Sequence, residues 1–235
     1  MSVALTLRVS SVRRASDSTR IVRLALAGAS FPYAAGQSVR IGPAERPERV
    51  PYSIASWPEE TRRRGSLEFL IKVEANEEWG ERFPPLRRGT GLEVIGPLGT
   101  FVFPENPVER DFLFIAGGTG IAPLRSMIRH ALEVRRTGSY RLLYSARTPS
   151  GFSYLPELRR LTREEAIELS LTTTRGASER WRGGRGRISA SALAPLVTRP
   201  ETLCFVCGPA AMVDDVPRYL QELGIPRERI RIEEW

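Results

Sequence analysis

The segment Gly117-Gly118-Thr119-Gly120-Ile121-Ala122-Pro123 decides the fold of the second half of the chain. It follows residues 111–116, a short apolar run typical of a buried parallel strand, and precedes residues 124–132, where apolar residues recur at helical spacing. Glycines let backbone N–H groups approach an anion, and a helix N-terminus adds partial positive charge. Strand, turn and helix therefore predict a phosphate cradle, although a purely structural turn would have the same composition.

Strands and helices alternate on the carboxyl side of this segment. Strands are expected at residues 140–146, 167–173, 203–207 and 230–233. Between them, helices are expected at 155–161 and 209–223, and residues 188–197 are expected to be helical at their centre. The alternation predicts an α/β domain with a doubly wound parallel sheet over residues 105–235.

Upstream, residues 1–104 contain many short alternating strands with Gly and Pro turns, which is typical of an antiparallel β-barrel. Within them, residues 57–65 are expected to form an exposed loop, because they contain Pro58 and three arginines. The linker Pro104-Glu105-Asn106-Pro107 marks the predicted boundary between two domains.

Composition excludes several classes of protein. The 235 residues contain no long apolar run and begin without a signal-peptide layout, so a cytoplasmic protein without membrane insertion is expected. The net charge is +8, and Lys72 is the only lysine among 35 basic residues. The arginines are scattered, with no aromatic-rich basic face, so nucleic-acid binding is not expected. An acidic protein partner or anionic cofactors explain the charge as well.

The two cysteines, Cys204 and Cys207, could suggest a redox dithiol or half of a zinc site. Residues three apart on a strand point to opposite faces, so a disulfide is geometrically poor. No metal site is expected, because His130 is the only histidine and zinc needs four ligands. A plant-type iron–sulfur cluster needs four thiolates, so no cluster of the chain's own is expected.

Three segments, read together with the glycine turn, resemble the ferredoxin–NADP reductase superfamily of flavin-dependent pyridine-nucleotide oxidoreductases. They are Arg49-Val50-Pro51-Tyr52-Ser53-Ile54-Ala55-Ser56, Cys207-Gly208-Pro209-Ala210-Ala211-Met212 and the end Glu233-Glu234-Trp235. The resemblance runs from about Leu5 to the last residue. It implies FAD, with FMN possible, and NADPH or NADH as cofactors. It also implies hydride transfer to flavin, then single-electron transfer to a separate ferredoxin or other iron–sulfur protein.

The resemblance assigns the flavin to the first domain. Tyr52 would cover the flavin ring and Ser53 would donate to its N5 atom; otherwise Tyr52 is a core aromatic and Ser53 a turn residue. The family's phosphate-binding arginine falls on Val50 here, and Arg49 lies one place earlier, on the opposite face of an extended strand. Arg49 reaches the same phosphate only if Pro51 or a bulge re-aims the chain.

A second departure concerns the flavin diphosphate. Phe83 stands where the family has a small hydroxyl residue, so the backbone N–H groups of Gly80, Glu81 and Arg82 are the remaining candidate ligands. Both departures leave room for FMN or for a loosely held flavin.

The resemblance assigns the nicotinamide cofactor to the second domain. The residues expected to hold its pyrophosphate are Gly117, Gly118, Thr119, Gly120 and Pro123. Cys207, with Gly208, would align the nicotinamide without forming a covalent bond, and Glu233 matches a carboxylate implicated in proton supply. Trp235 matches an aromatic that covers the flavin where nicotinamide must stack, or else is a hydrophobic stopper on the last strand.

The choice between NADPH and NADH is made near the adenosine ribose. Arg147 follows the second strand of the α/β domain, and Thr174-Arg175 follow the third, with no acidic residue at these positions. Arginines favour a 2′-phosphate, which points to NADPH, although chance placement is possible in so arginine-rich a chain. Two alternatives stay open for the protein as a whole: a reductase of free flavin, and an electron-handling regulatory subunit of a larger complex.

Overall fold

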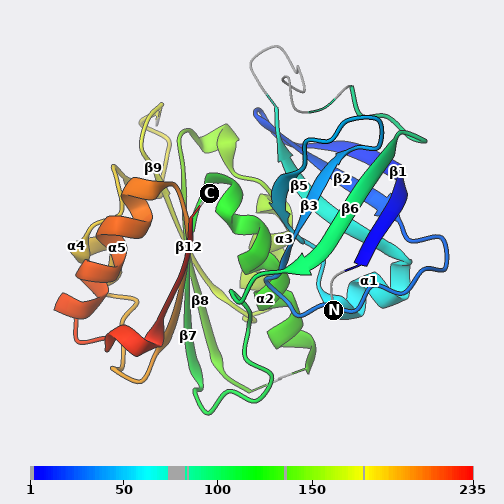
Figure 1. The fold of residues 1–235 in the computed structure, drawn as a ribbon. Coiled ribbons are helices and arrows are strands. Elements are labelled where there is room, and N and C mark those ends of the chain that lie inside the picture. The colour runs from blue at the N-terminus through cyan, green and yellow to red at the C-terminus, as the bar shows by residue number, and fades with distance from the viewer. Residues whose placement is uncertain (1–2, 74–82, 84, 135–136, 177, 235) are drawn as a thin grey trace. The chain divides into compact units, whose positions relative to one another are not determined.

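A computed structural model describes residues 3–73, 83, 85–134, 137–176 and 178–234 (Figure 1). Its residue contacts divide the chain into two units. The first contains residues 1–103 with 125–133, and the second contains residues 104–124 with 134–235. The predicted boundary at residue 104 stays a prediction, and the two units are described separately below.

The first unit is built on a six-stranded antiparallel sheet in the order β4-β3-β6-β1-β2-β5. Its strands are β1 (Val3–Ser16), β2 (Thr19–Ala25), β3 (Ser38–Pro43), β4 (Val50–Ser53), β5 (Ser66–Lys72) and β6 (Gly91–Leu98). The sheet curls until its edge strands β4 and β5 meet at a bridge between Ile54 and Phe69. Alternating residues such as Leu7, Val9 and Leu24 enclose the core of this barrel-like sheet, as the period-two pattern predicts.

One sequence expectation for this unit is wrong. The expected loop at residues 57–65 contains helix α1 (Pro58–Arg64), whose Pro58, Glu60 and Thr61 are buried. Pro58 occupies the first turn, acidic residues follow it, and arginines fill the last turn, all of which stabilise a helix. Gly65 ends the helix with a left-handed φ of +60°. Proline and glycine here mark the two ends of a helix rather than a loop.

The second unit is a parallel sheet in the order β10-β9-β8-β7-β11-β12. Its strands are β7 (Asp111–Gly117), β8 (Ser139–Ala146), β9 (Glu168–Thr173), β10 (Gly184–Arg185), β11 (Leu203–Gly208) and β12 (Ile230–Glu234). The strand order reverses direction between β7 and β11. In such sheets, ligands bind outside the carboxyl ends of the strands at this reversal.

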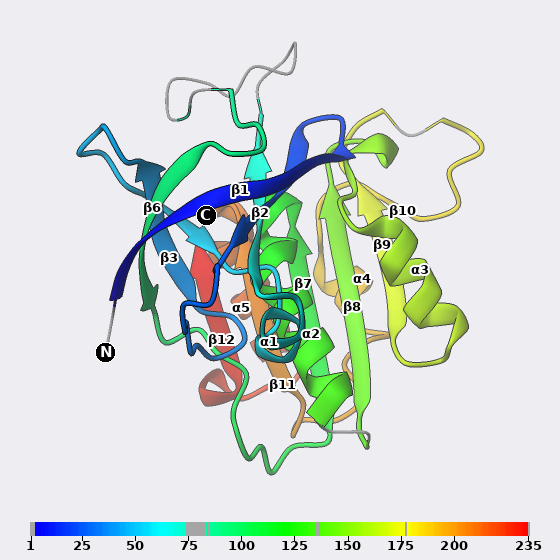
Figure 2. The ribbon, with the colours of Figure 1, turned by 90° about the vertical axis from the view of Figure 1, so that its right-hand side faces the viewer.

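The second unit's helices agree with the expected pattern. They are α3 (Leu155–Arg163), α4 (Ala190–Leu193) and α5 (Ala210–Glu222), with short 3-10 turns at Gly118–Gly120, Pro149–Gly151 and Arg227–Arg229. Figures 1 and 2 show α4 and α5 on one face of the parallel sheet and α3 on the other. Helix α2 (Ile121–Val134) begins in the second unit, and its residues 125–133 belong to the first.

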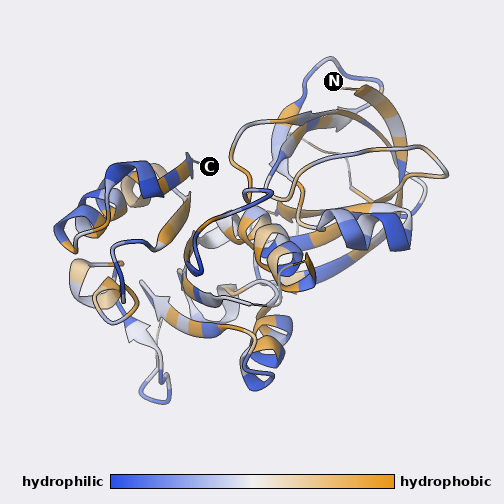
Figure 3. Cartoon of the chain, turned by 90° about the horizontal axis from the view of Figure 1, so that it is seen from below, coloured by the Kyte–Doolittle hydropathy of each residue, from blue (hydrophilic) through white to orange (hydrophobic). Residues whose placement is uncertain are grey.

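Strands of the first unit carry hydrophobic and hydrophilic residues in alternating bands, as Figure 3 shows. In the second unit, Leu113, Ile115 and Val206 pack with apolar residues of α4 and α5 to form the core. Within the part of the chain that the structure describes, no helix is both long and apolar enough to cross a membrane.

Candidate functional site

Strand β4 carries the two residues expected to face a flavin. Ser53 pairs with Ser38 and Tyr52 with Val39 on the neighbouring strand β3. The Tyr52 ring is half-buried, and its centre lies 5.7 Å from that of Phe83. Ser53 is buried, and its hydroxyl has no hydrogen-bond partner among the described residues. A buried hydroxyl without a hydrogen-bond partner destabilises the folded protein. This hydroxyl could therefore donate a hydrogen bond to an acceptor on a bound ligand.

Hydrogen bonds fix the backbone of the three residues that follow Ser53. The backbone N–H of Ile54 donates to Gln37, and that of Ala55 donates to Glu68, at 2.9 and 2.8 Å. The Ser56 carbonyl accepts hydrogen bonds from Tyr33 and Ser126. The position of Ser53 is therefore set by a rigid backbone and not by bonds of its own hydroxyl.

Arg49 lies just before β4 and is engaged by the protein. Its Nε donates to Glu93 on β6 at 2.7 Å, and a second guanidinium nitrogen donates to the Glu48 carbonyl at 3.0 Å. The same side chain also contacts the Arg46 carbonyl. Binding a flavin phosphate would require this guanidinium to leave Glu93, so its assignment stays a prediction.

Three other candidate flavin ligands, Gly80, Glu81 and Arg82, lie outside the described residues, as does Trp235. Phe83, which replaces the family's small hydroxyl residue, is buried in the barrel core. The Phe83 side chain therefore packs in the core, and it has no polar atom that could bind a phosphate.

The glycine turn forms the expected strand–turn–helix junction after β7. Gly118 adopts a φ of +55° and is exposed, with open space where a Cβ would project. Thr119 is half-buried, and Pro123 lies in the first turn of α2. Because only glycine reaches this conformation at little cost and leaves the surface clear, the turn fits an anion cradle.

Gly117 and Gly120 allow close packing between the ends of two strands. A Cβ on Gly120 would lie 2.2 Å from the Cys207 carbonyl oxygen, and one on Gly117 would lie 2.9 Å from Met212 and Pro209. The turns that end β7 and β11 are therefore in direct backbone contact. Close packing therefore explains Gly117 and Gly120, whereas phosphate binding by this turn stays a prediction.

Tyr144 is a residue that the sequence analysis missed. It lies fully buried on β8 and donates its hydroxyl to the Gly118 carbonyl at 3.0 Å. The backbone N–H of Ser153 donates to the same hydroxyl at 3.2 Å. Burial raises the pKa of Tyr144 well above its ordinary value, so the hydroxyl remains a donor. A tyrosine among the apolar residues of a central strand was the available signal.

Cys207 is the second-last residue of β11, which lies between β7 and β12. It is in register with Ala116 of β7 and with Glu233 of β12, so Cys207 and Glu233 lie side by side on neighbouring strands. Cys207 is fully buried, whereas Glu233 is half-buried. Both cysteines are thiols, and Cys204 belongs to the core, where burial raises its pKa to about 12. The structure thus brings together two of the predicted catalytic residues, Cys207 and Glu233.

The carboxyl ends of β8 and β9 bring the predicted ribose-binding residues together. The backbone N–H of Arg175 donates to the Arg147 carbonyl at 2.7 Å, and that of Thr174 donates to Ala146 at 3.0 Å. Both arginine side chains are exposed, and no carboxylate among the described residues pairs with either. The hydroxyls of Thr148 and Ser150 lie 3.2 Å apart next to them. Two guanidinium groups and two hydroxyls can bind a phosphate monoester.

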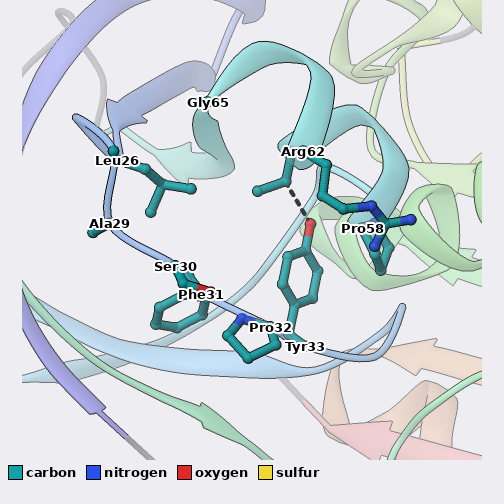
Figure 4. Close-up of a pocket in the computed structure, with 11 residues that line it drawn as sticks. Leu26, Ala29, Ser30, Phe31, Pro32, Tyr33, Pro58, Arg62 and Gly65 are labelled. Carbon is teal, nitrogen blue, oxygen red and sulfur yellow. Dashed lines mark hydrogen bonds between the residues drawn. The ribbon is translucent and has the colours of Figure 1, made fainter.

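The first unit also contains a cavity (Figure 4). It has a volume of about 310 Å³ and is lined by the segment from Gly28 to Tyr33 and by helix α1. The Tyr33 hydroxyl lies 2.7 Å from that of Thr61, as the dashed line shows. Among the described residues, none of the predicted site residues lines this cavity, and its Tyr33 and Thr61 hydroxyls already pair with each other.

Comparison with known proteins matches each half of the chain to a family of its own. A model of the oxidoreductase FAD-binding domain matches residues 6–103, and one of the oxidoreductase NAD-binding domain matches residues 114–218. Oxidoreductase NAD-binding domain-containing protein 1 of Danio rerio is 32% identical, over 97% of this chain and 90% of that protein. Ferredoxin–NADP reductase B of Sorangium cellulosum is 33% identical, over 88% of this chain and 87% of that protein.

Solved structures show the same fold. A cytochrome P450 reductase of Amycolatopsis superposes with a TM-score of 0.86 at 24% identity, over 99% of this chain and 70% of that one. The ferredoxin reductase of carbazole 1,9a-dioxygenase gives a TM-score of 0.83 at 25% identity, over 99% and 69%.

A curled antiparallel sheet with a doubly wound parallel sheet, and family matches for flavin and nicotinamide domains, define a two-cofactor oxidoreductase. The chain belongs to the ferredoxin–NADP reductase superfamily. It is an enzyme that uses FAD and NAD(P)H.

Proposed function

We propose that this oxidoreductase takes electrons from NADPH and delivers them, through FAD, to a separate ferredoxin or other iron–sulfur protein. FAD, when bound, would supply both hydride and single-electron chemistry, which side chains cannot supply. The two cysteines of the sequence cannot ligate a plant-type cluster, so the acceptor must bring its own. The Sorangium relative, named as a ferredoxin–NADP reductase, supports the same acceptor class.

The observation that carries the choice of NADPH is the pairing of Arg147 and Arg175. Their backbones are hydrogen-bonded at the carboxyl ends of adjacent strands, and both guanidinium groups are exposed without a paired carboxylate among the described residues. Together with Thr174 and the neighbouring hydroxyls, they would bind the 2′-phosphate that NADH lacks.

The chain's own residues then have distinct roles. Tyr52 would cover the flavin ring, and the Ser53 hydroxyl would donate to flavin N5. Gly117, Gly118, Thr119 and Gly120 would bind the nucleotide pyrophosphate at the start of α2, with Pro123 shaping its first turn. Cys207 and Gly208 would align the nicotinamide, Glu233 would hold the proton at its carboxylate, and Trp235 would exclude water from the flavin.

A kinetic comparison of variants tests the nucleotide assignment. Arg175→Ala and Arg147→Ala should each raise the KM for NADPH by about tenfold or more, the value of one charge-assisted hydrogen bond, and leave the KM for NADH unchanged. Arg163→Ala, an exposed arginine at the end of α3, is the matched control. Equal KM values for NADPH in all three variants and the unaltered protein would refute the assignment.

A reductase of free flavin is the second candidate, and the engagement of Arg49 favours it. With Val50 at the family's arginine position and Arg49 held by Glu93, the flavin phosphate lacks its usual cation. The visible spectrum of the purified protein decides between the two. Yellow protein that reduces ferredoxin with NADPH supports the first proposal, whereas colourless protein that reduces added flavin supports the second.

A further inference from the structure

The segment Ile54–Ser56 joins the flavin-binding strand to the polar centre of the first unit. All three residues are almost completely buried, with at most 1% of their surface exposed. The Ser56 hydroxyl accepts a hydrogen bond from the Glu68 N–H at 3.1 Å, in addition to the carbonyl contacts described above. A buried segment with this many fixed backbone groups has little freedom to rotate, and it begins at Ser53.

Two residues of helix α2 complete these contacts. Arg125 donates to the Ala55 carbonyl at 2.7 Å, and Ser126 donates to the Ser56 carbonyl at 2.7 Å. Both side chains are buried, at 4% and 0% exposed, and they follow the glycine cradle by one helical turn. Successive residues of one helix therefore hold successive carbonyls of the segment that leaves Ser53.

The charge of Arg125 is matched inside the same unit. Its guanidinium lies 3.2 Å from Glu68 and 3.8 Å from Glu60, and Arg23 lies 2.6 Å from Glu68. Because Arg125 is buried, its guanidinium is desolvated, and the two equally buried carboxylates orient it. The ion pairs thus aim one N–H of Arg125 at the Ala55 carbonyl.

We propose that Arg125 and Ser126 are positioning residues that hold the Ser53 hydroxyl in place for FAD by fixing the Ala55 and Ser56 carbonyls. They act through the backbone and do not touch the cofactor. Among the described residues the Ser53 hydroxyl has no hydrogen-bond partner, so the backbone that these two side chains hold sets its position. The inference rests on the proposed contact between Ser53 and FAD.

The test compares FAD binding in five variants of the full chain. Arg125→Met, Arg125→Lys, Ser126→Ala and Ser53→Ala are measured with Arg129→Met, which makes the same exchange one turn later on α2. Arg129 stacks over the Trp57 ring at 4.6 Å and contacts neither carbonyl in the described hydrogen bonds. The readouts are the FAD dissociation constant by flavin fluorescence, the visible spectrum, the midpoint potential of bound FAD and a melting curve.

We expect Arg125→Met and Ser126→Ala each to weaken FAD binding at least about fivefold, the factor that one buried hydrogen bond contributes. Both should shift the spectrum and potential in the same direction as Ser53→Ala. Arg125→Lys should recover part of the loss, and Arg129→Met should change the FAD dissociation constant less than twofold. If Arg125→Met fails to fold, Ser126→Ala, which removes a single oxygen, decides alone.

Several results would overturn the inference. Lower melting temperatures with an unchanged FAD dissociation constant, spectrum and potential would mean that both residues only stabilise the fold. An Arg129→Met effect as large as that of Arg125→Met would mean that any change on α2 disturbs FAD. If Ser53→Ala is silent, the proposed Ser53 contact fails as well. If Ser53→Ala acts and the α2 variants do not, only the positioning role fails.

Discussion

Replacing Gly120 by alanine should separate the turn's packing role from its phosphate-binding role. The new Cβ would lie 2.2 Å from the Cys207 carbonyl oxygen and 2.6 Å from its carbonyl carbon, about 1.2 Å short of an ordinary contact at 3.4 Å. Both obstructing atoms are backbone, and Cys207 is hydrogen-bonded in the ladder between β7 and β11, so neither can rotate away. The steric clash can be relieved only if the ends of β7 and β11 move apart.

The expected cost is about 3 kcal/mol, the upper range for an overpacked site. For a chain of this length, that lowers the melting temperature by roughly 6–12 °C. Gly118→Ala is the matched control because its Cβ meets nothing within 4 Å and bears only the left-handed φ of +55°. It should cost about 1 kcal/mol, or roughly 2–4 °C.

Relative to the stability that each variant loses, Gly118→Ala should weaken nucleotide binding more than Gly120→Ala does. Gly118→Ala places a methyl group in the space where the pyrophosphate would lie, so NADP⁺ binding should weaken at least about tenfold despite near-normal melting. Melting curves and NADP⁺ titrations of both variants measure this. A Gly120→Ala protein as stable as the unaltered chain would refute the packing argument, and unchanged NADP⁺ binding by Gly118→Ala would refute the cradle.

Three further predictions concern the ion pairs, the acceptor and the last residue. The hydrogen bond from Arg63 lowers the pKa of Glu133 against the opposing effect of burial, so its contribution to stability is present above its ordinary value of 4.5 and lost as pH falls below it. Glu133→Gln should flatten the acid limb of a plot of unfolding free energy against pH; an unchanged limb would contradict this. Reduction of an acidic ferredoxin should slow as salt rises, because charges separated by more than about 8 Å are screened at physiological ionic strength, and a salt-independent rate would argue against electrostatic steering. Trp235→Ser should strengthen nicotinamide binding and relax discrimination between NADPH and NADH, as titration with each oxidised nucleotide would show; a change in the melting curve alone would make Trp235 a stopper.

The parallel sheet of the second unit was predictable because each of its strands and helices has its own local signal. Apolar runs, helical spacing and glycine turns place β7, β8, β9, β11 and β12 within a residue or two of their observed ends. Helix α1 was missed because its proline and arginines were read as loop composition, although the same residues suit a helix start and end.

Parts of the site depend on contacts between distant residues, which periodicity does not reveal. The pairing of Arg49 with Glu93 joins residues 44 apart, and the contact of Arg125 with Ala55 joins residues 70 apart. The close contact between Gly120 and Cys207 likewise arises only because β7 and β11 are adjacent strands in the sheet. Sequence motifs indicated which residues are candidates for ligand binding or catalysis. The tertiary structure shows which of these side chains already interact with other protein groups.

The assignment of residues 125–133 to the first unit has a consequence for building chimaeras from relatives of this enzyme. The chain enters the second unit at residue 104, returns to the first at 125 and leaves it again at 134. No single crossover point can therefore exchange one unit intact. A junction in the link after Phe103 would confront Glu60 and Glu68 with a foreign helix, and their counter-charge would then depend on the other parent. Recombinants should retain FAD most often when residues 125–133 and the flavin-binding strands descend from the same parent.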